Sequence, residues 1–121
     1  MKLSNVIARV SDIEVSVAFW RDRVGLDSSW SGGEFAFFDL GDSRLVLHQP
    51  QVFKQQVSDT ELVFEVEDVR SVVSEMRGRD VPFEVEPRPV TSDGERTLLS
   101  AHFRDPDGHL ASVTGWVERV D

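Results

Sequence analysis

The chain repeats one pattern twice, and this internal repeat constrains the fold more than any single motif does. Residues 5–13 (NVIARVSDI) and 61–69 (ELVFEVEDV) each read as a short strand that leads into a helix. Equivalent positions, such as Asp12 and Asp68, are separated by a constant 56 residues. Repeated units of this kind bury their apolar faces by packing against a neighbour. The sequence therefore predicts two matched modules, with a site where strands of the two halves converge.

The first half predicts a βαβββ module, module one, over residues 1–48. Ser11 and Glu14 have the spacing of a capping box. Apolar residues at helical spacing follow until Gly25, which is expected to end the helix. Three short strands, separated by glycine-containing turns, are expected next, over residues 28–30, 34–40 and 44–48.

The second half, module two, repeats this plan over residues 61–118 after a polar linker over residues 49–60. Its helix is expected to begin near Asp68 and to end at Gly78, and residues 87–95 read as a turn-rich loop. Strands are expected over residues 61–66, 82–86, 98–104 and 109–115. Roughly 55 residues are too few for one module to be stable alone. We therefore predict a single domain of the α+β class: two tandem βαβββ modules that form a curved mixed sheet, with a central cleft and the helices outside.

Composition narrows the range of partners and compartments. A net charge of −9 over 121 residues disfavours nucleic acid as a partner, because phosphate binding needs clustered Lys and Arg. No apolar run approaches the roughly 18 residues of a membrane span, and the first residues lack the apolar stretch of a signal peptide. The absence of cysteine excludes disulfides and thiolate metal sites. We expect a cytoplasmic protein with no membrane partner, whose acidity serves solubility or attracts a cationic ligand.

Three phrases in register with the repeat resemble the vicinal oxygen chelate superfamily, which includes glyoxalase I, bleomycin-resistance proteins, fosfomycin-resistance enzymes and extradiol dioxygenases. They are VIARVSDIEVSVAFWRDRVGL (6–26), LVFEVEDV (62–69) and HFRDPDGHL (102–110). The resemblance covers nearly the whole chain and implies the same fold as the repeat does. It also implies a homodimer and a small-molecule ligand or substrate, with antibiotic resistance as one role found among such proteins. A fold shared by many activities does not select one of them.

The resemblance places the usual four metal ligands of the superfamily at Asn5, Val46, Glu61 and Ser112. Of these, Glu61 alone is a good ligand for a transition metal. We therefore expect no metal at the usual position and no other cofactor. A relocated divalent metal held by His48, Glu61 and His102 remains as an alternative.

Strand alternation selects the residues expected to face the cleft. With Trp30 added as an aromatic that could stack on a ligand, the expected ligand-binding residues are Asn5, Ile7, Arg9, Trp30, Val46, His48, Glu61, Val63, Glu65, Ser100, His102 and Ser112. Glu61 and His48 are the candidate catalytic residues, acting as base and acid. Arg9 is the alternative partner that would neutralise Glu61 or Glu65. Trp116, expected to follow the last strand, reads as an edge or dimer contact.

Two functions follow from these residues. The first is a metal-free protein that binds a small organic molecule, aromatic or cationic, in the cleft between the modules. The alternative is an enzyme, a lyase, isomerase or dioxygenase, that uses the relocated metal or acid–base chemistry of Glu61 and His48. The sequence does not decide whether the protein is an enzyme.

Overall fold

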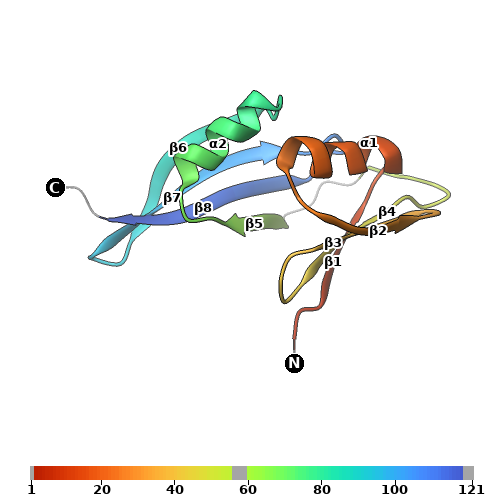
Figure 1. The fold of residues 1–121 in the computed structure, drawn as a ribbon, viewed down its shortest axis with the longest axis horizontal. Coiled ribbons are helices and arrows are strands. Elements are labelled where there is room, and N and C mark those ends of the chain that lie inside the picture. Colours follow the sequence, from red (N-terminus) through yellow and green to blue (C-terminus); the bar gives the residue numbers. More distant parts are fainter. Residues whose placement is uncertain (1, 56–59, 119–121) are drawn as a thin grey trace. The chain divides into compact units, whose positions relative to one another are not determined.

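The computed structural model describes residues 2–55 and 60–118. Contacts between Cα atoms group the chain into two compact units, Met1–Val57 and Ser58–Asp121, which contain module one and module two (Figure 1). Each module has its own helix and its own four-stranded sheet.

Module one has the predicted order of strand, helix and three strands. Its strands pair in the order β1-β4-β3-β2, with β1 and β4 parallel and the other neighbours antiparallel. The helix α1 continues directly into a π-helical segment, η1. The bounds are β1 (Asn5–Arg9), α1 (Ile13–Ala18), η1 (Phe19–Val24), β2 (Ser28–Gly32), β3 (Phe35–Asp39) and β4 (Arg44–His48).

Module two repeats this topology. Its strands pair in the order β5-β8-β7-β6, and β5 is parallel to β8 just as β1 is parallel to β4. The bounds are β5 (Glu61–Glu65), α2 (Val69–Gly78), β6 (Phe83–Ser92), β7 (Arg96–Arg104) and β8 (Leu110–Glu118). The predicted α+β class with two tandem βαβββ modules is confirmed, with one four-stranded mixed sheet in each module.

Both helices begin at an aspartate of the repeat. The Asp12 carboxylate accepts hydrogen bonds from the backbone N–H groups of Glu14 and Val15, and the Asp68 carboxylate accepts one from Ser71. An Asp side chain at this position satisfies N–H groups that have no partner within the helix. The predicted capping box with Ser11 as the cap was therefore wrong, because the helix begins one residue later. Gly25, with φ of 97°, ends the first helix as predicted.

The apolar face of each helix covers one face of its own sheet. In module one, Trp20 is fully buried, together with the strand residues Phe38 and Leu47. In module two, the helix residue Met76 and the strand residue Phe103 are likewise fully buried between the helix and the sheet. Alternation along each strand then places the intervening residues on the other sheet face, which we call the distal face of that module. Within residues 2–55 and 60–118, neither helix has the length and apolar character that crossing a membrane requires.

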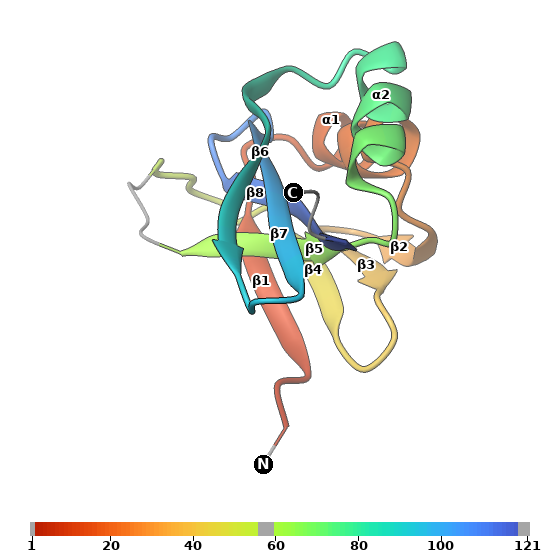
Figure 2. The ribbon, with the colours of Figure 1, turned by 90° about the vertical axis from the view of Figure 1, so that its left-hand side faces the viewer.

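Module two departs from the prediction at its hairpins. β6 continues to Ser92 through most of the expected loop over residues 87–95, and it pairs with β7 as far as Thr97 (Figure 2). Register shifts along β6 accommodate this length, because a bulge lets a strand that contains Pro continue its pairing. β8 likewise runs to Glu118 rather than to Gly115. Trp116 therefore lies within the last strand and not after it.

Candidate ligand-binding surfaces

The predicted site residues of module one share its distal face. Ile7 pairs with Val46, which pairs with Phe37, which pairs with Trp30. Paired residues of neighbouring strands point to the same side of a sheet. Asn5 and Arg9 lie two residues to either side of Ile7 on the same face, and His48 pairs with Arg9. The six expected residues, Asn5, Ile7, Arg9, Trp30, Val46 and His48, therefore share one sheet face, and their role in ligand binding stays a prediction.

Aromatic rings form a continuous row across this distal face. Phe35 and His48 are stacked in parallel, with centroids 4.4 Å apart and planes 6° apart. Phe37 lies 6.5 Å from Phe35 and 5.4 Å from Trp30, the ring at the far end of the row. Trp30 is 56% exposed, and Ile7, on the opposite edge strand β1, is 60% exposed. The row therefore presents apolar rings, inclined to one another by 6° to 55°, on the sheet face that carries the residues predicted to contact a ligand.

Glu34 is a neighbour of His48 that the sequence analysis missed. The carboxylate oxygen Oε1 of Glu34 lies 3.8 Å from Nε2 of His48. The backbone carbonyl of Glu34 accepts a hydrogen bond from the N–H of Gln49, which extends the β3–β4 ladder by one residue. The sequence does place Glu34 at the start of the strand expected over residues 34–40, directly before Phe35, the ring that stacks on His48.

The distal face of module two carries hydroxyls and carboxylates where module one has its row of rings. Val63 pairs with Ser112, which pairs with His102, and Glu65 pairs with Thr114, which pairs with Ser100. Ser100, Ser112 and Thr114 are buried, whereas Val63 is 59% exposed. All of the predicted residues of module two, Glu61, Val63, Glu65, Ser100, His102 and Ser112, therefore lie on this face.

Glu61 lies beside a histidine of its own module. Its Oε1 is 3.7 Å from Nε2 of His102, across the intervening strand β8. The sequence analysis expected His48 as the acid–base partner of Glu61. His48 belongs to the other compact unit, so that pairing stays a prediction, as does the pairing of Glu61 or Glu65 with Arg9.

Trp116 lies on the same distal face, two residues beyond Thr114 along β8. The register of β7 and β8 is regular here and pairs Trp116 with Leu98 and Glu118 with Arg96. The guanidinium carbon of Arg96 lies over the indole, 5.0 Å from the ring centroid. The sequence predicts a last strand that ends at Gly115, so Trp116 is missing from the predicted residues of this face.

The residues at the usual metal-ligand positions of the superfamily do not fit a divalent metal. Val46 is buried and carries no donor atom, and Asn5 and Ser112 are weak ligands for transition metals. In the described parts of the chain, no three His, Asp or Glu side chains are grouped closely enough to hold a metal ion. We therefore derive no chemistry through a metal, and metal-free function stays a prediction.

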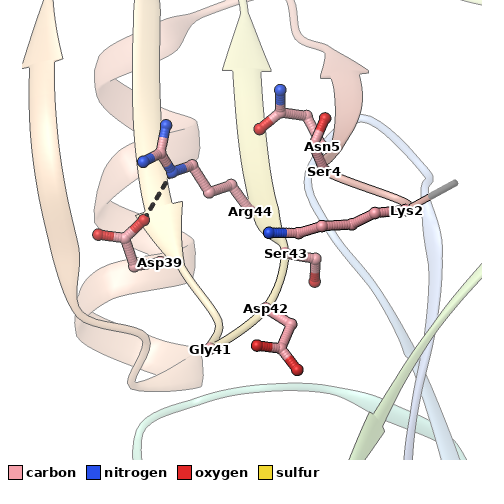
Figure 3. Close-up of a pocket in the computed structure, with 8 residues that line it drawn as sticks. All are labelled: Lys2, Ser4, Asn5, Asp39, Gly41, Asp42, Ser43 and Arg44. Atoms are coloured by element: carbon pink, nitrogen blue, oxygen red, sulfur yellow. Dashed lines mark hydrogen bonds and ion pairs between the residues drawn. The ribbon is translucent and has the colours of Figure 1, made fainter.

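A polar hollow of about 520 Å³ lies at one end of the module-one sheet, next to the first residue of β1 (Figure 3). It is lined by two basic side chains, Lys2 and Arg44, and two acidic ones, Asp39 and Asp42. Arg44 is already engaged, because its Nε donates to Asp39 at 2.8 Å. Asn5 joins this hollow to the predicted site. The balanced charge of its lining selects no ligand class.

The turn between β7 and β8, part of the third resembling phrase, is fixed by a buried carboxylate. Asp105 accepts hydrogen bonds from the backbone N–H groups of Asp107 and His109, and its other oxygen lies 2.7 Å from Nδ1 of His109. This side-chain hydrogen bond raises the pKa of His109, and the charges of Asp105 and Asp107 act in the same direction. The turn is a structural element of the module, and its hydrogen bond favours the protonated form of the His109 imidazole.

Comparison with known proteins agrees with this architecture. The family model Glyoxalase/Bleomycin resistance protein/Dioxygenase superfamily matches residues 2–113. The uncharacterized protein YraH of Bacillus subtilis (strain 168) is 30% identical, over 93% of this chain and 97% of that protein.

Two solved structures illustrate the shared fold. A glyoxalase/bleomycin resistance protein/dioxygenase from Nocardioides has a TM-score of 0.79 at 18% identity, covering 100% of this chain and 87% of that one. Lactoylglutathione lyase from Agrobacterium tumefaciens has a TM-score of 0.74 at 21% identity, covering 93% of this chain and 92% of that one. The predicted resemblance is confirmed: the chain belongs to the Glyoxalase/Bleomycin resistance protein/Dioxygenase superfamily.

Proposed function

We propose that the protein binds a small organic molecule with a flat aromatic group, and that binding requires no metal. The observation that carries this proposal is the row of rings on the distal face of module one. Its outer end, Trp30, is 56% exposed and follows a β-bulge that shifts the pairing of β2 with β3 between Ser28 and Trp30. The inner end is a parallel stack of Phe35 on His48.

The geometry favours stacking as the mode of recognition. Aromatic rings associate with centroids roughly 4.5–7 Å apart in offset or edge-on arrangements. The rings of the row keep this spacing among themselves, so a ligand ring placed on the row would meet ring faces and edges. Phe38, which alternates with Phe37, is buried on the helix side and supports the core instead. Ring placement on β3 is therefore divided between packing and an accessible surface.

The test is a titration with a panel of flat aromatic compounds, followed by calorimetry in the presence of a metal chelator. We expect saturable binding that the chelator leaves unchanged. A stacking contact is worth about 0.5–1.5 kcal/mol, so Trp30→Ala should weaken binding about two- to twelvefold. Val15→Ala is the matched control, because Val15 is an exposed apolar residue on α1, on the other side of the sheet. Equal effects of the two substitutions, or no binding across the panel, would contradict the proposal.

A second candidate function rests on the proximity of Glu61 and His102. A carboxylate 3.7 Å from an imidazole can share a proton with it when a substrate draws the two together. In this alternative the protein is a lyase or isomerase that uses acid–base chemistry in module two. Glu61→Gln would then abolish turnover while the far-ultraviolet circular dichroism spectrum stays unchanged. A fully active Glu61→Gln variant would exclude Glu61 from the chemistry.

We further propose that the protein is a cytoplasmic homodimer. Antibiotic resistance is one role that sequestration of a ligand would serve. Light scattering after size exclusion at high protein concentration measures the oligomeric state directly. A strict monomer would contradict the homodimer without affecting the ligand proposal.

A further inference from the structure

The Trp116 indole in module two carries a resident cation. Arg96 comes from the neighbouring strand β7, and its guanidinium lies over the ring at 5.0 Å from the centroid. A cation within about 6 Å of an indole centroid is attracted by the negative face of the ring. Trp116 pairs with Leu98, and Arg96 pairs with Glu118 two residues further along the same regular hairpin, so strand pairing places both side chains on one sheet face.

Arg96 is held only lightly in this position. Its side chain is 54% exposed, and its contact with the Asp93 carboxylate is long, at 3.4 Å. Exposed ion pairs of this kind contribute little to stability, because water screens them and ordering the side chains costs entropy. A competing cation would therefore displace the guanidinium from the ring at small cost to the fold.

The charges around the ring favour a positive ligand. Glu65 lies on the neighbouring strand β5 and pairs with Thr114, two residues before Trp116. Glu118 follows Trp116 by two residues on the same face. The hydroxyls of Thr114 and Ser100 separate Glu65 from Arg88, which lies at the far edge of that row. A ligand that reaches the ring from the β5 side would therefore meet a carboxylate before it meets a basic side chain.

We infer that the Trp116 face of module two is a binding site for an organic ammonium ion, with Arg96 as the built-in cation that the ligand replaces. The recognised group is a methylated or quaternary ammonium, whose charge is spread over apolar methyl groups and is weakly hydrated. Glu65 supplies the counter-charge. This site lies on module two and takes a cation, so it is independent of the aromatic row proposed for module one.

Nitrogen-15 NMR of the full chain tests the site directly, because the three tryptophans, Trp20, Trp30 and Trp116, give three indole N–H signals. Trp116→Phe assigns the signal of Trp116. The probe is choline, and the neutral probe of the same shape is 3,3-dimethylbutan-1-ol. We expect choline to shift the Trp116 signal saturably, with Trp30 unchanged, and the neutral alcohol to have little effect. No shift with choline, or equal shifts with both probes, overturns the inference.

Arg96→Gln sharpens the test because it removes the resident cation and leaves the ring. Exposed cation–π contacts correspond to a factor of about two to five in affinity, so choline should bind Arg96→Gln more tightly than wild type by that factor. Arg77 provides the matched control, since its guanidinium lies 5.5 Å from the Phe83 centroid and it pairs with Glu86. Arg77→Gln should leave choline affinity unchanged. Weaker choline binding by Arg96→Gln overturns the displacement model. Titration with the panel of flat aromatic compounds tests module one separately, because those compounds are expected to shift the Trp30 signal and not the Trp116 signal.

Discussion

The two modules share a backbone plan and differ in the surface that each presents. Equivalent positions 56 residues apart perform equivalent structural work: Asp12 and Asp68 cap the helices, and Trp20 and Met76 fill the helix–sheet core. The distal faces have diverged, with stacked rings in module one and carboxylates and hydroxyls in module two. The repeat therefore preserves the helix caps and the buried core positions, whereas the distal faces carry different side chains.

The largest expected effect comes from emptying the two equivalent core positions. Trp20→Ala should lower the free energy of unfolding by about 3–5 kcal/mol, because a fully buried indole leaves a large cavity. Met76→Ala should cost about 2–5 kcal/mol and be the smaller loss of the pair, since the deleted volume is smaller and neighbouring side chains can close it more completely. Urea denaturation measures both. A Met76→Ala variant less stable than Trp20→Ala would break the proposed order of the two cores.

Gly115 marks a close approach between β8 and the start of the second helix. A Cβ atom at Gly115 would lie 2.5 Å from the carbonyl oxygen of Val66 and 2.8 Å from Cγ2 of Val69. Gly115→Ala should therefore destabilise the protein by about 1–3 kcal/mol through forced backbone movement. Gly78→Ala is the control, because nothing lies within 4 Å of the added atom, and it should be neutral or slightly stabilising. Thermal unfolding of the two variants would contradict this assignment if their midpoints shifted alike.

The helix caps allow the repeat to be compared at one pair of positions. Replacement of an Asp N-cap by Ala costs about 0.5–2 kcal/mol. Asp12 accepts two backbone hydrogen bonds and Asp68 accepts one. We therefore expect Asp12→Ala to lower the free energy of unfolding more than Asp68→Ala does. Chemical denaturation of the two variants in parallel gives the difference, and the reverse order would show that the number of these hydrogen bonds does not set the strength of the cap.

The smallest expected effect is a pH dependence that belongs to module two. The hydrogen bond with Asp105 raises the pKa of His109 in the folded protein. A raised folded pKa means that the folded state binds the proton more tightly, so this stabilisation is complete below the unfolded value of about 6.5. It is lost as the pH rises through the folded pKa. His109→Asn should remove this loss of stability above about pH 6.5, measured by denaturation at a series of pH values. An unchanged pH profile in the variant would place the dependence elsewhere.

Much of the fold was readable from the sequence because the repeat ties local signals together. Two copies of the same strand–helix phrase predicted the topology and the strand alternation, and the distal-face residues followed from that alternation. The errors lie where local patterns compete with pairing. The Pro-rich run over residues 87–92 reads as a loop, yet it continues as a strand because bulges in β6 keep it paired with β7.

The sequence by itself determined the two βαβββ modules, the caps within one residue, the buried helix stripes and, by strand alternation, the sheet face of every predicted site residue except Trp30. These features depend on short-range spacing, because the period of about two residues in strands and 3.6 residues in helices can be recognised directly in the sequence. Only the tertiary structure decided which side chains meet across strands: His48 with Phe35 and Glu34, Glu61 with His102, and Trp116 with Arg96. Such contacts depend on strand order and register, which bring together residues that are distant in sequence, and no local pattern specifies them.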